Sequence, residues 1–87
     1  MRLEWTSDAL ADLARLNDHL IDVNPKAAAE AILALTTAPE RLLEYPRLGE
    51  RLEQFAPNEI RRIFVGRYEL RYQIRDSVIS ILHLWHT

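Results

Sequence analysis

The fold is decided by residues 60–86, which read IRRIFVGRYELRYQIRDSVISILHLWH. Apolar and polar residues alternate along most of this stretch, which is the pattern of strands that bury one face. Two pairs of residues that favour tight turns, Gly66-Arg67 and Asp76-Ser77, divide it into three runs. The sequence therefore predicts three consecutive antiparallel strands joined by two-residue turns. Their expected bounds are residues 60–65, 68–75 and 78–86.

The alternation also predicts which side chains share a face of this sheet. In the middle strand Leu70 and Tyr72 lie on one face, and we expect that face to pack against helices. The same rule turns Leu82 and Leu84 of the last strand toward the helices. The outer face, meaning the face away from the helices, then combines arginines with apolar side chains and is the candidate binding surface. Its expected members are Arg62, Phe64, Arg71, Arg75, Ile81, His83 and Trp85.

The N-terminal part of the chain is predicted to form a short strand followed by a helix. Residues 2–6 alternate between polar and apolar side chains, as a strand does. Ser7 follows with a hydroxyl suited to an N-cap, and leucines then recur every three or four residues. Asn24 and Pro25 end this helix and begin the next, because asparagine caps helices well and proline fits the first helical position.

The second helix is rich in alanine, which lets two helices approach closely as an antiparallel hairpin. Pro39 lacks the N–H that would continue the helical hydrogen bonds, so we expect a kink or a break near residues 36–39. The helix should end by Tyr45, because Pro46 restricts the residue before it. Residues 46–59 are then predicted to be a connecting loop with one short turn.

The predicted element order is β-α-α-β-β-β, an α+β fold in which an antiparallel C-terminal sheet packs on an N-terminal helical hairpin. With 87 residues the chain has room for one domain only, spanning residues 1–87. A chain of this length buries only about 60% of its extended surface on folding. A partner that covers further apolar surface would therefore stabilise it.

Several kinds of chemistry are not supported by the sequence. The chain has no cysteine, so it offers neither a disulfide nor a thiolate metal site. His83 and His86 are three residues apart on a strand and point to opposite faces, so no metal site is expected. No glycine-rich phosphate loop opens a helix, and no serine has neighbours that would activate it. The apolar runs are too short to span a bilayer, so we expect a cytoplasmic protein without a cofactor.

Charge is unevenly distributed along the chain. The net charge is -2, but residues 1–59 carry six Lys/Arg and eleven Asp/Glu, whereas residues 60–87 carry five arginines and two acids. The positive charge lies on the predicted sheet, where it favours an acidic partner. An ordinary solvated surface is the alternative. Likewise, Phe64 and Trp85 either bind a partner or cover the sheet edge and the loop of residues 46–59.

Four segments of the chain resemble toxins of the RelE/ParE superfamily, which are often called plasmid stabilisation proteins. The segments are residues 5–13, 43–49, 61–74 and 81–87. The first is similar to the family's opening strand and helix, and the second contains its Pro-x-x-Gly element as Pro46 to Gly49. The last two are similar to the C-terminal half of these toxins. Together they cover nearly the whole chain and agree with the order β-α-α-β-β-β.

The resemblance implies a toxin of a bacterial type II toxin–antitoxin module, neutralised by a cognate antitoxin of the ParD or RelB type that wraps around it. It also implies one of two targets. RelE-like members cut mRNA on the ribosome, a task that favours a basic protein with side chains for acid–base catalysis. In this chain Arg62, Arg71 and His83 would form that group. ParE-like members bind DNA gyrase without a catalytic site.

Charge and side-chain chemistry favour gyrase as the target. The chain has an isoelectric point near 5.9, arginine is a poor general base, and no tyrosine follows the last strand, where several of the nucleases have one. We therefore expect gyrase inhibition, with ribosome-dependent mRNA cleavage and a non-toxic interaction module as alternatives. Family members usually continue past the position of Thr87 with basic residues, so the resemblance leads us to expect weaker toxicity.

Overall fold

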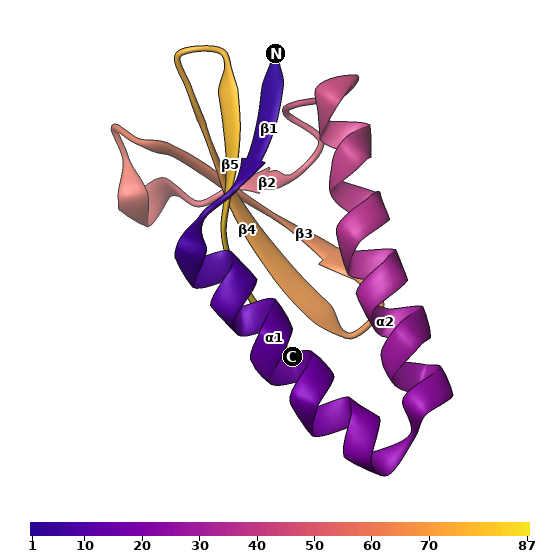
Figure 1. Cartoon of the computed structure of the whole chain (residues 1–87). Helices are drawn as coiled ribbons and strands as arrows, with labels where there is room; N and C mark the ends of the chain where they lie inside the picture. The colour runs from indigo at the N-terminus through magenta and orange to yellow at the C-terminus, as the bar shows by residue number, and fades with distance from the viewer.

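The computed structural model describes residues 1–87 and confirms the α+β architecture, with two helices on one face of a five-stranded sheet (Figure 1). The strands lie in the order β1-β5-β4-β3-β2, and α1 and α2 diverge from a tip that projects below the sheet in Figure 1. In chain order the elements are β1 (Arg2–Trp5), α1 (Ser7–Val23), α2 (Pro25–Thr37), the 3-10 helix η1 (Ala38–Leu43), β2 (Glu50–Arg51), the 3-10 turn η2 (Glu53–Phe55), β3 (Glu59–Val65), β4 (Tyr68–Arg75) and β5 (Val78–His86).

The sheet is mixed, because two short strands join the three predicted antiparallel ones. β3, β4 and β5 pair antiparallel as expected, with turns at the two predicted positions. β1 pairs with β5 in parallel, from Arg2 opposite Val78 to Trp5 opposite Ile81. β2 lies within the segment expected to be a loop, and its two residues are too few to give a periodic signal.

Both helix starts use side-chain caps, and one of them differs from the prediction. Thr6, not Ser7, caps α1: the Thr6 hydroxyl accepts the N–H of Ala9 at 3.1 Å. The same hydroxyl donates to the carbonyl of Ile81 at 2.8 Å, so this cap also attaches α1 to β5, which a sequence pattern does not reveal. Asn24 caps α2 as predicted, accepting the N–H of Ala27.

Proline ends the second helix where the sequence predicts. The α-helical part of α2 stops at Thr37 and continues as η1, with Pro39 near its start. This tighter helix turns Leu42 into the centre of the molecule, where it is fully buried. The break predicted at Pro39 is therefore confirmed, and the 3-10 helix that follows it brings Leu42 into the core.

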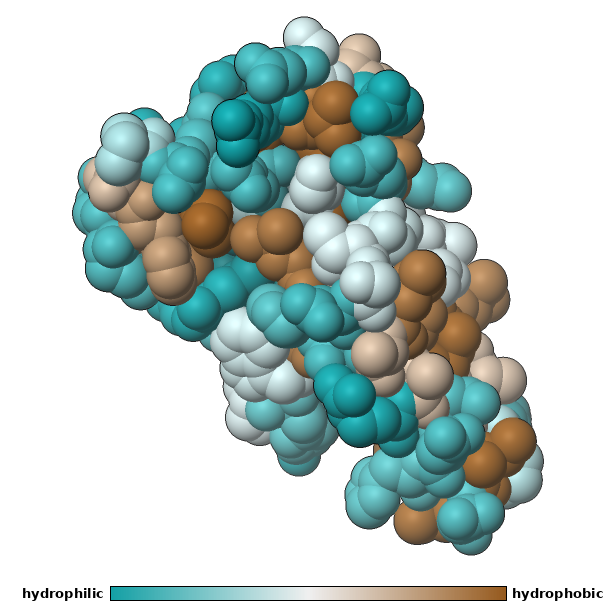
Figure 2. Space-filling view, turned by 60° about the vertical axis from the view of Figure 1, so that its left-hand side comes forward, coloured by the Kyte–Doolittle hydropathy of each residue, from teal (hydrophilic) through white to brown (hydrophobic).

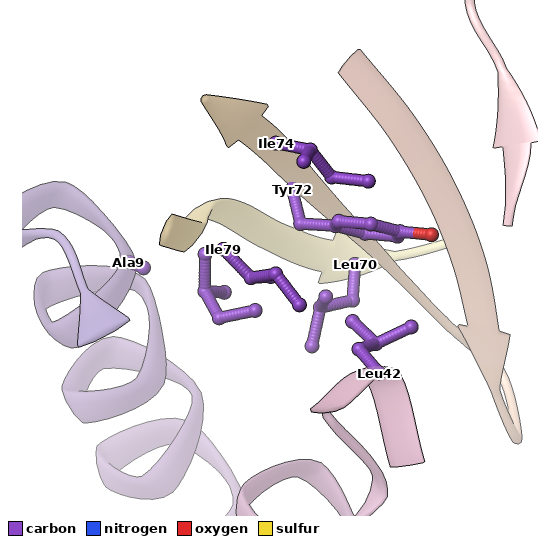
Figure 3. Close-up of a cluster of buried hydrophobic side chains, with 7 residues drawn as sticks. Ala9, Leu42, Leu70, Tyr72, Ile74 and Ile79 are labelled. Atoms are coloured by element: carbon purple, nitrogen blue, oxygen red, sulfur yellow. The ribbon is translucent and has the colours of Figure 1, made fainter. Parts of the chain in front are cut away.

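The hydrophobic core lies between the sheet and the helices, and it is small (Figure 3). Only 14 of the 87 residues are buried, so much apolar surface stays exposed. Figure 3 shows Leu42 of η1 next to Leu70 of β4, with Ala9 of α1 on the other side of Ile79. The cluster consists of Ala9, Leu42, Leu70, Tyr72, Ile74, Ile79 and Ile81.

An irregularity between β4 and β5 contradicts the prediction for Ile81 and Leu82. Arg71 pairs with His83, but the next residue, Tyr72, pairs with Ile81, so Leu82 is left without a partner as a β-bulge. One extra residue reverses the alternation. Ile81 therefore lies in the core instead of on the outer face, whereas Leu84 is buried as predicted. No glycine or other residue typical of bulges marks this position in the sequence. A prediction from strict alternation therefore fails here.

A tyrosine and a glycine attach the loop after η1 to the centre of the sheet. The hydroxyl of Tyr72 donates to the carbonyl of Pro46 at 2.7 Å and accepts the N–H of Gly49 at 3.0 Å. Burial raises the pKa of Tyr72 above its ordinary value of 10.0. Arg61 donates to the carbonyl of Gly49 at 2.8 Å. The Pro-x-x-Gly element is thus held by the sheet through its two end residues.

Tyr72→Phe is expected to lower the free energy of unfolding by about 2 kcal/mol, because it leaves the buried N–H of Gly49 without an acceptor. Urea unfolding followed by circular dichroism measures the change. Tyr45→Phe is the matched control: Tyr45 is 56% exposed, and the same atom is removed from a solvated ring. Equal stabilities of the two variants would show that the Tyr72 hydroxyl does not hold the loop.

Glu59 forms ion pairs with Arg47 and Arg61 beside this loop. Because of these pairs, we expect the stability of the fold to depend on pH. Partial burial alone would raise the pKa of Glu59, but hydrogen bonds from Arg61 and Arg47 outweigh it and hold the pKa below 4.5. The folded state therefore binds this proton more weakly than the unfolded state. The ion pairs stabilise the fold above about pH 4.5, and this contribution disappears as the pH falls through the lowered pKa.

We expect the stability difference between the wild type and Glu59→Gln to be largest at pH 7 and to shrink below pH 4.5. Urea midpoints measured from pH 7 to pH 3 give this difference directly. Glu53→Gln serves as the control, because its side chain is 76% exposed and pairs only with Arg51. A difference that is constant over the whole pH range would rule out the titration of Glu59 as its cause.

Candidate functional site

Five of the seven predicted site residues cluster together on the outer face of the sheet. Arg62, Arg71 and His83 form one cross-strand row over β3, β4 and β5. Phe64 and Trp85 belong to the next row, on either side of Glu69. Strand periodicity predicted these positions correctly, because the bulge lies beyond them toward the other end of β5. The role of the five residues as a binding site stays a prediction.

The other two predicted residues do not belong to this cluster. Ile81 is buried in the core because of the bulge. Arg75 lies at the far end of β4, where its side chain is 76% exposed and its nearest acid is Asp76 at 3.7 Å. We therefore restrict the candidate site to the two rows.

Glu69 lies at the centre of the cluster, and no motif in the sequence singled it out. Although it is on the outer face, Glu69 is only 5% exposed. Its carboxylate accepts from Arg71 Nε at 2.8 Å and from Arg62 Nη1 at 3.4 Å. Arg62 also pairs with Glu50 of β2, at 3.0 Å from Nη2. The hydrogen bond to Glu50 raises the pKa of Arg62, which is charged at any physiological pH.

These pairs change the expected electrostatics of the outer face. Two arginines and two glutamates meet there, so the local charge is balanced instead of positive. The row of Arg62 and Arg71 therefore lacks the net positive charge from which an acidic partner was predicted, and the partner itself stays a prediction. Alternation in the sequence predicted that the two arginines share a face. It did not predict that Glu50 and Glu69 form ion pairs with them.

The guanidinium groups of the same two arginines also lie against aromatic rings. The guanidinium of Arg71 lies 4.7 Å from the ring centre of Trp85 and 5.6 Å from that of Phe55. The guanidinium of Arg62 lies 5.3 Å from the ring centre of Phe64. Cation–π contacts of this kind restrict the arginine side chains. Phe64 and Trp85 nevertheless remain 57% and 38% exposed, so they are accessible to a partner.

His83 is paired with a carboxylate from the first helix. Asp12 Oδ2 lies 3.0 Å from His83 Nδ1 and accepts the N–H of Leu84 at 3.0 Å, while its other oxygen pairs with Arg15. The pair joins residues 71 positions apart, so no local pattern could reveal it. A carboxylate on Nδ1 orients the imidazole and leaves Nε2 free, an arrangement suited to proton transfer.

Two shallow hollows border the outer face. One lies between η1 and β3, and the other lies beside the Asp12–His83 pair. The first hollow is lined mainly by Ala38, Arg41, Leu48, Ile63, Phe64 and Val65, and the second by Asp12, Arg15, Leu16, His19, Leu84 and Trp85.

The exposed apolar residues do not form one continuous patch. In the space-filling view they form several separate brown areas among polar residues, including some at the lower end, where the helical tip lies (Figure 2).

Two further kinds of site are not found. No three His, Cys, Asp or Glu side chains lie close enough together to hold a metal ion. Neither helix has the length and apolar character needed to cross a membrane.

Comparisons with known proteins agree on one group of relatives. The family described as "ParE toxin of type II toxin-antitoxin system, parDE" matches residues 3–87. Toxin RelE2 of Caulobacter vibrioides is 37% identical over 82 residues, which cover 94% of this chain and 90% of the relative.

Two solved structures have the same fold. The chromosomal ParDE system of P. aeruginosa superposes with a TM-score of 0.84 at 22% identity, over 100% of this chain and 96% of that one. The toxin–antitoxin complex RelBE2 of Mycobacterium tuberculosis superposes with a TM-score of 0.61 at 26% identity, over 99% of this chain and 90% of that one.

Proposed function

We propose that this chain, which belongs to the ParE toxin family of type II toxin–antitoxin systems, inhibits DNA gyrase and is neutralised by a cognate antitoxin. The family membership confirms the resemblance noted in the sequence. The gyrase target and the use of the outer face are the proposal. It places the protein in the cytoplasm, where gyrase acts, as a single domain with no catalytic site.

The observation that carries the proposal is the internal pairing of Arg62 and Arg71. Both guanidiniums are held by Glu69 and by aromatic rings, and Arg62 is held also by Glu50. A nuclease that docks on ribosomal RNA needs arginines that are free to contact phosphates. A charge-balanced face with exposed aromatic rings instead favours a protein partner, because aromatic and arginine side chains are enriched in protein interfaces.

The small core supports an antitoxin partner. Ten large apolar side chains are exposed, and a wrapping partner would cover them. The structural relatives are toxin–antitoxin systems, so an antitoxin of the ParD or RelB type is the proposed partner. Binding only the folded toxin, it would also raise the toxin's stability.

Induced expression in bacteria tests the proposal. We expect growth arrest in which incorporation of labelled thymidine falls before incorporation of labelled methionine, because a poisoned gyrase stops replication first. Co-expression of the cognate antitoxin should restore growth. An arrest in which methionine incorporation falls first would overturn the gyrase target, and no growth effect at all would favour a non-toxic interaction module.

A ribosome-dependent nuclease is the second candidate function, and the Asp12–His83 pair is the observation that favours it. The imidazole lies beside Arg71 in the same cross-strand row, which gives a proton-transfer group next to a cation. The name of the relative Toxin RelE2 points to the same class. If the chain is a nuclease, the wild type should cut mRNA on the ribosome and His83→Ala should abolish the cuts, whereas the gyrase proposal expects neither protein to cut mRNA.

A further inference from the structure

The position of Glu69 calls for a physical reason, because a carboxylate on the solvent side of a sheet is normally hydrated. Here it is 5% exposed, although the arginines that bind it keep about 30% of their side-chain surface in water. A buried ion pair contributes little net stability, since removing its charges from water costs about as much as their attraction returns. Stability alone is therefore a weak reason for a glutamate at this place.

We propose that Glu69 is a specificity-determining residue, an internal carboxylate that occupies Arg62 and Arg71 and so keeps phosphate groups of nucleic acid away from the outer face. Its two oxygens take the donor directions that a phosphate would use, at 2.8 Å from Arg71 Nε and 3.4 Å from Arg62 Nη1. This role concerns nucleic acid and stands independently of whether gyrase is the target.

The surroundings of Arg71 show what Glu69 prevents. Arg71 has no acidic partner other than Glu69, and its guanidinium lies near the rings of Trp85 and Phe55. Trp85 is exposed and Phe55 is half-buried. An arginine beside an accessible aromatic ring is the combination with which proteins bind single-stranded nucleic acid, through phosphate contact and base stacking. Without the glutamate charge, the face would have the chemistry of a single-strand binding surface.

The test compares oligonucleotide binding by the wild type and Glu69→Gln. Fluorescence anisotropy with a labelled single-stranded RNA of about ten nucleotides, within the length that one small binding domain covers, gives the dissociation constant at low and at moderate salt. We expect about tenfold tighter binding by Glu69→Gln at the lower salt, and a salt slope steeper by about 0.7 for each additional phosphate that the variant neutralises. Circular dichroism checks that the variant is folded.

Two controls separate this role from a general effect of charge or structure. Glu53→Gln makes the same change in net charge at an exposed site that contacts only Arg51, and it should leave affinity unchanged. Arg71→Ala added to Glu69→Gln should return the affinity to that of the wild type. Equally tighter binding by Glu53→Gln and Glu69→Gln would overturn the proposal, and so would a folded Glu69→Gln that binds as weakly as the wild type.

A further measurement decides the question even if Glu69→Gln does not fold. In the otherwise unchanged chain, Arg71→Ala is expected to leave RNA affinity as it is, because Glu69 already occupies this arginine. A tenfold loss of affinity in Arg71→Ala would mean that the arginine is available to phosphates in the wild type, and the inference would be wrong.

Discussion

Gly49→Ala is expected to lower the free energy of unfolding by about 3 kcal/mol, which is a large part of the stability of a domain this size. A Cβ atom at Gly49 would lie 2.5 Å from the carbonyl oxygen of Arg62 and 2.9 Å from the ring of Tyr72. Neither neighbour can move easily: the first is backbone of β3, and the second is fully buried. To relieve the clash, the loop would have to leave the sheet and lose its bond to the Tyr72 hydroxyl.

Gly66→Ala is the comparison that separates crowding from backbone conformation. Gly66 has a φ of +60° in the turn between β3 and β4, and a Cβ there would meet no atom within 4 Å. The expected cost is about 1 kcal/mol, due to the left-handed conformation alone. Thermal or urea unfolding of both variants measures the difference. If Gly66→Ala destabilised the chain more than Gly49→Ala, the close contact at Gly49 would not be what fixes the loop.

Trp85→Ala is expected to weaken gyrase inhibition about 30-fold, which is about 2 kcal/mol, the loss typical of an aromatic residue at the centre of an interface. Trp85 is 38% exposed on the outer face, so its removal leaves the core cluster intact. The substitution removes both an accessible ring and the surface against which Arg71 lies. The concentration of protein that halves supercoiling by purified gyrase gives the effect.

Leu33→Ala is the matched control for Trp85→Ala. Leu33 is 64% exposed on α2, so the substitution also removes an exposed apolar side chain, but it does so away from the sheet. We expect Leu33→Ala to inhibit gyrase as the wild type does. If Trp85→Ala inhibited gyrase at unchanged concentration, the outer face would not be the surface that contacts the target.

The architecture was largely predictable because its signals are local. Alternation defined β3, β4 and β5, while Asn24, Pro25 and Pro39 marked the limits of α2. The bulge at Leu82 follows from no residue pattern, and two other failures come from contact between distant segments. The Thr6 hydroxyl that caps α1 also bonds to the carbonyl of Ile81, and β2 pairs with β3. Local patterns carry no information on either contact.

The candidate site was predictable in its positions but not in its chemistry. Periodicity placed Arg62, Arg71 and Trp85 on one face, since side-chain direction follows from strand geometry. The partners of these residues come from other parts of the chain: Glu50 from β2 and Asp12 from α1. Glu69 was visible in the alternation as an outward residue, yet its burial between two arginines required the structure.

The target is tested most directly by giving one protein preparation to both candidate targets. Purified gyrase with plasmid DNA and ATP is trapped with detergent after incubation, and cleaved linear plasmid is measured on a gel. In parallel, translating ribosomes with a defined mRNA are analysed for new 3′ ends by primer extension. The gyrase proposal predicts accumulation of linear plasmid and intact mRNA, whereas normal gyrase activity together with ribosome-dependent cuts in the mRNA would contradict it.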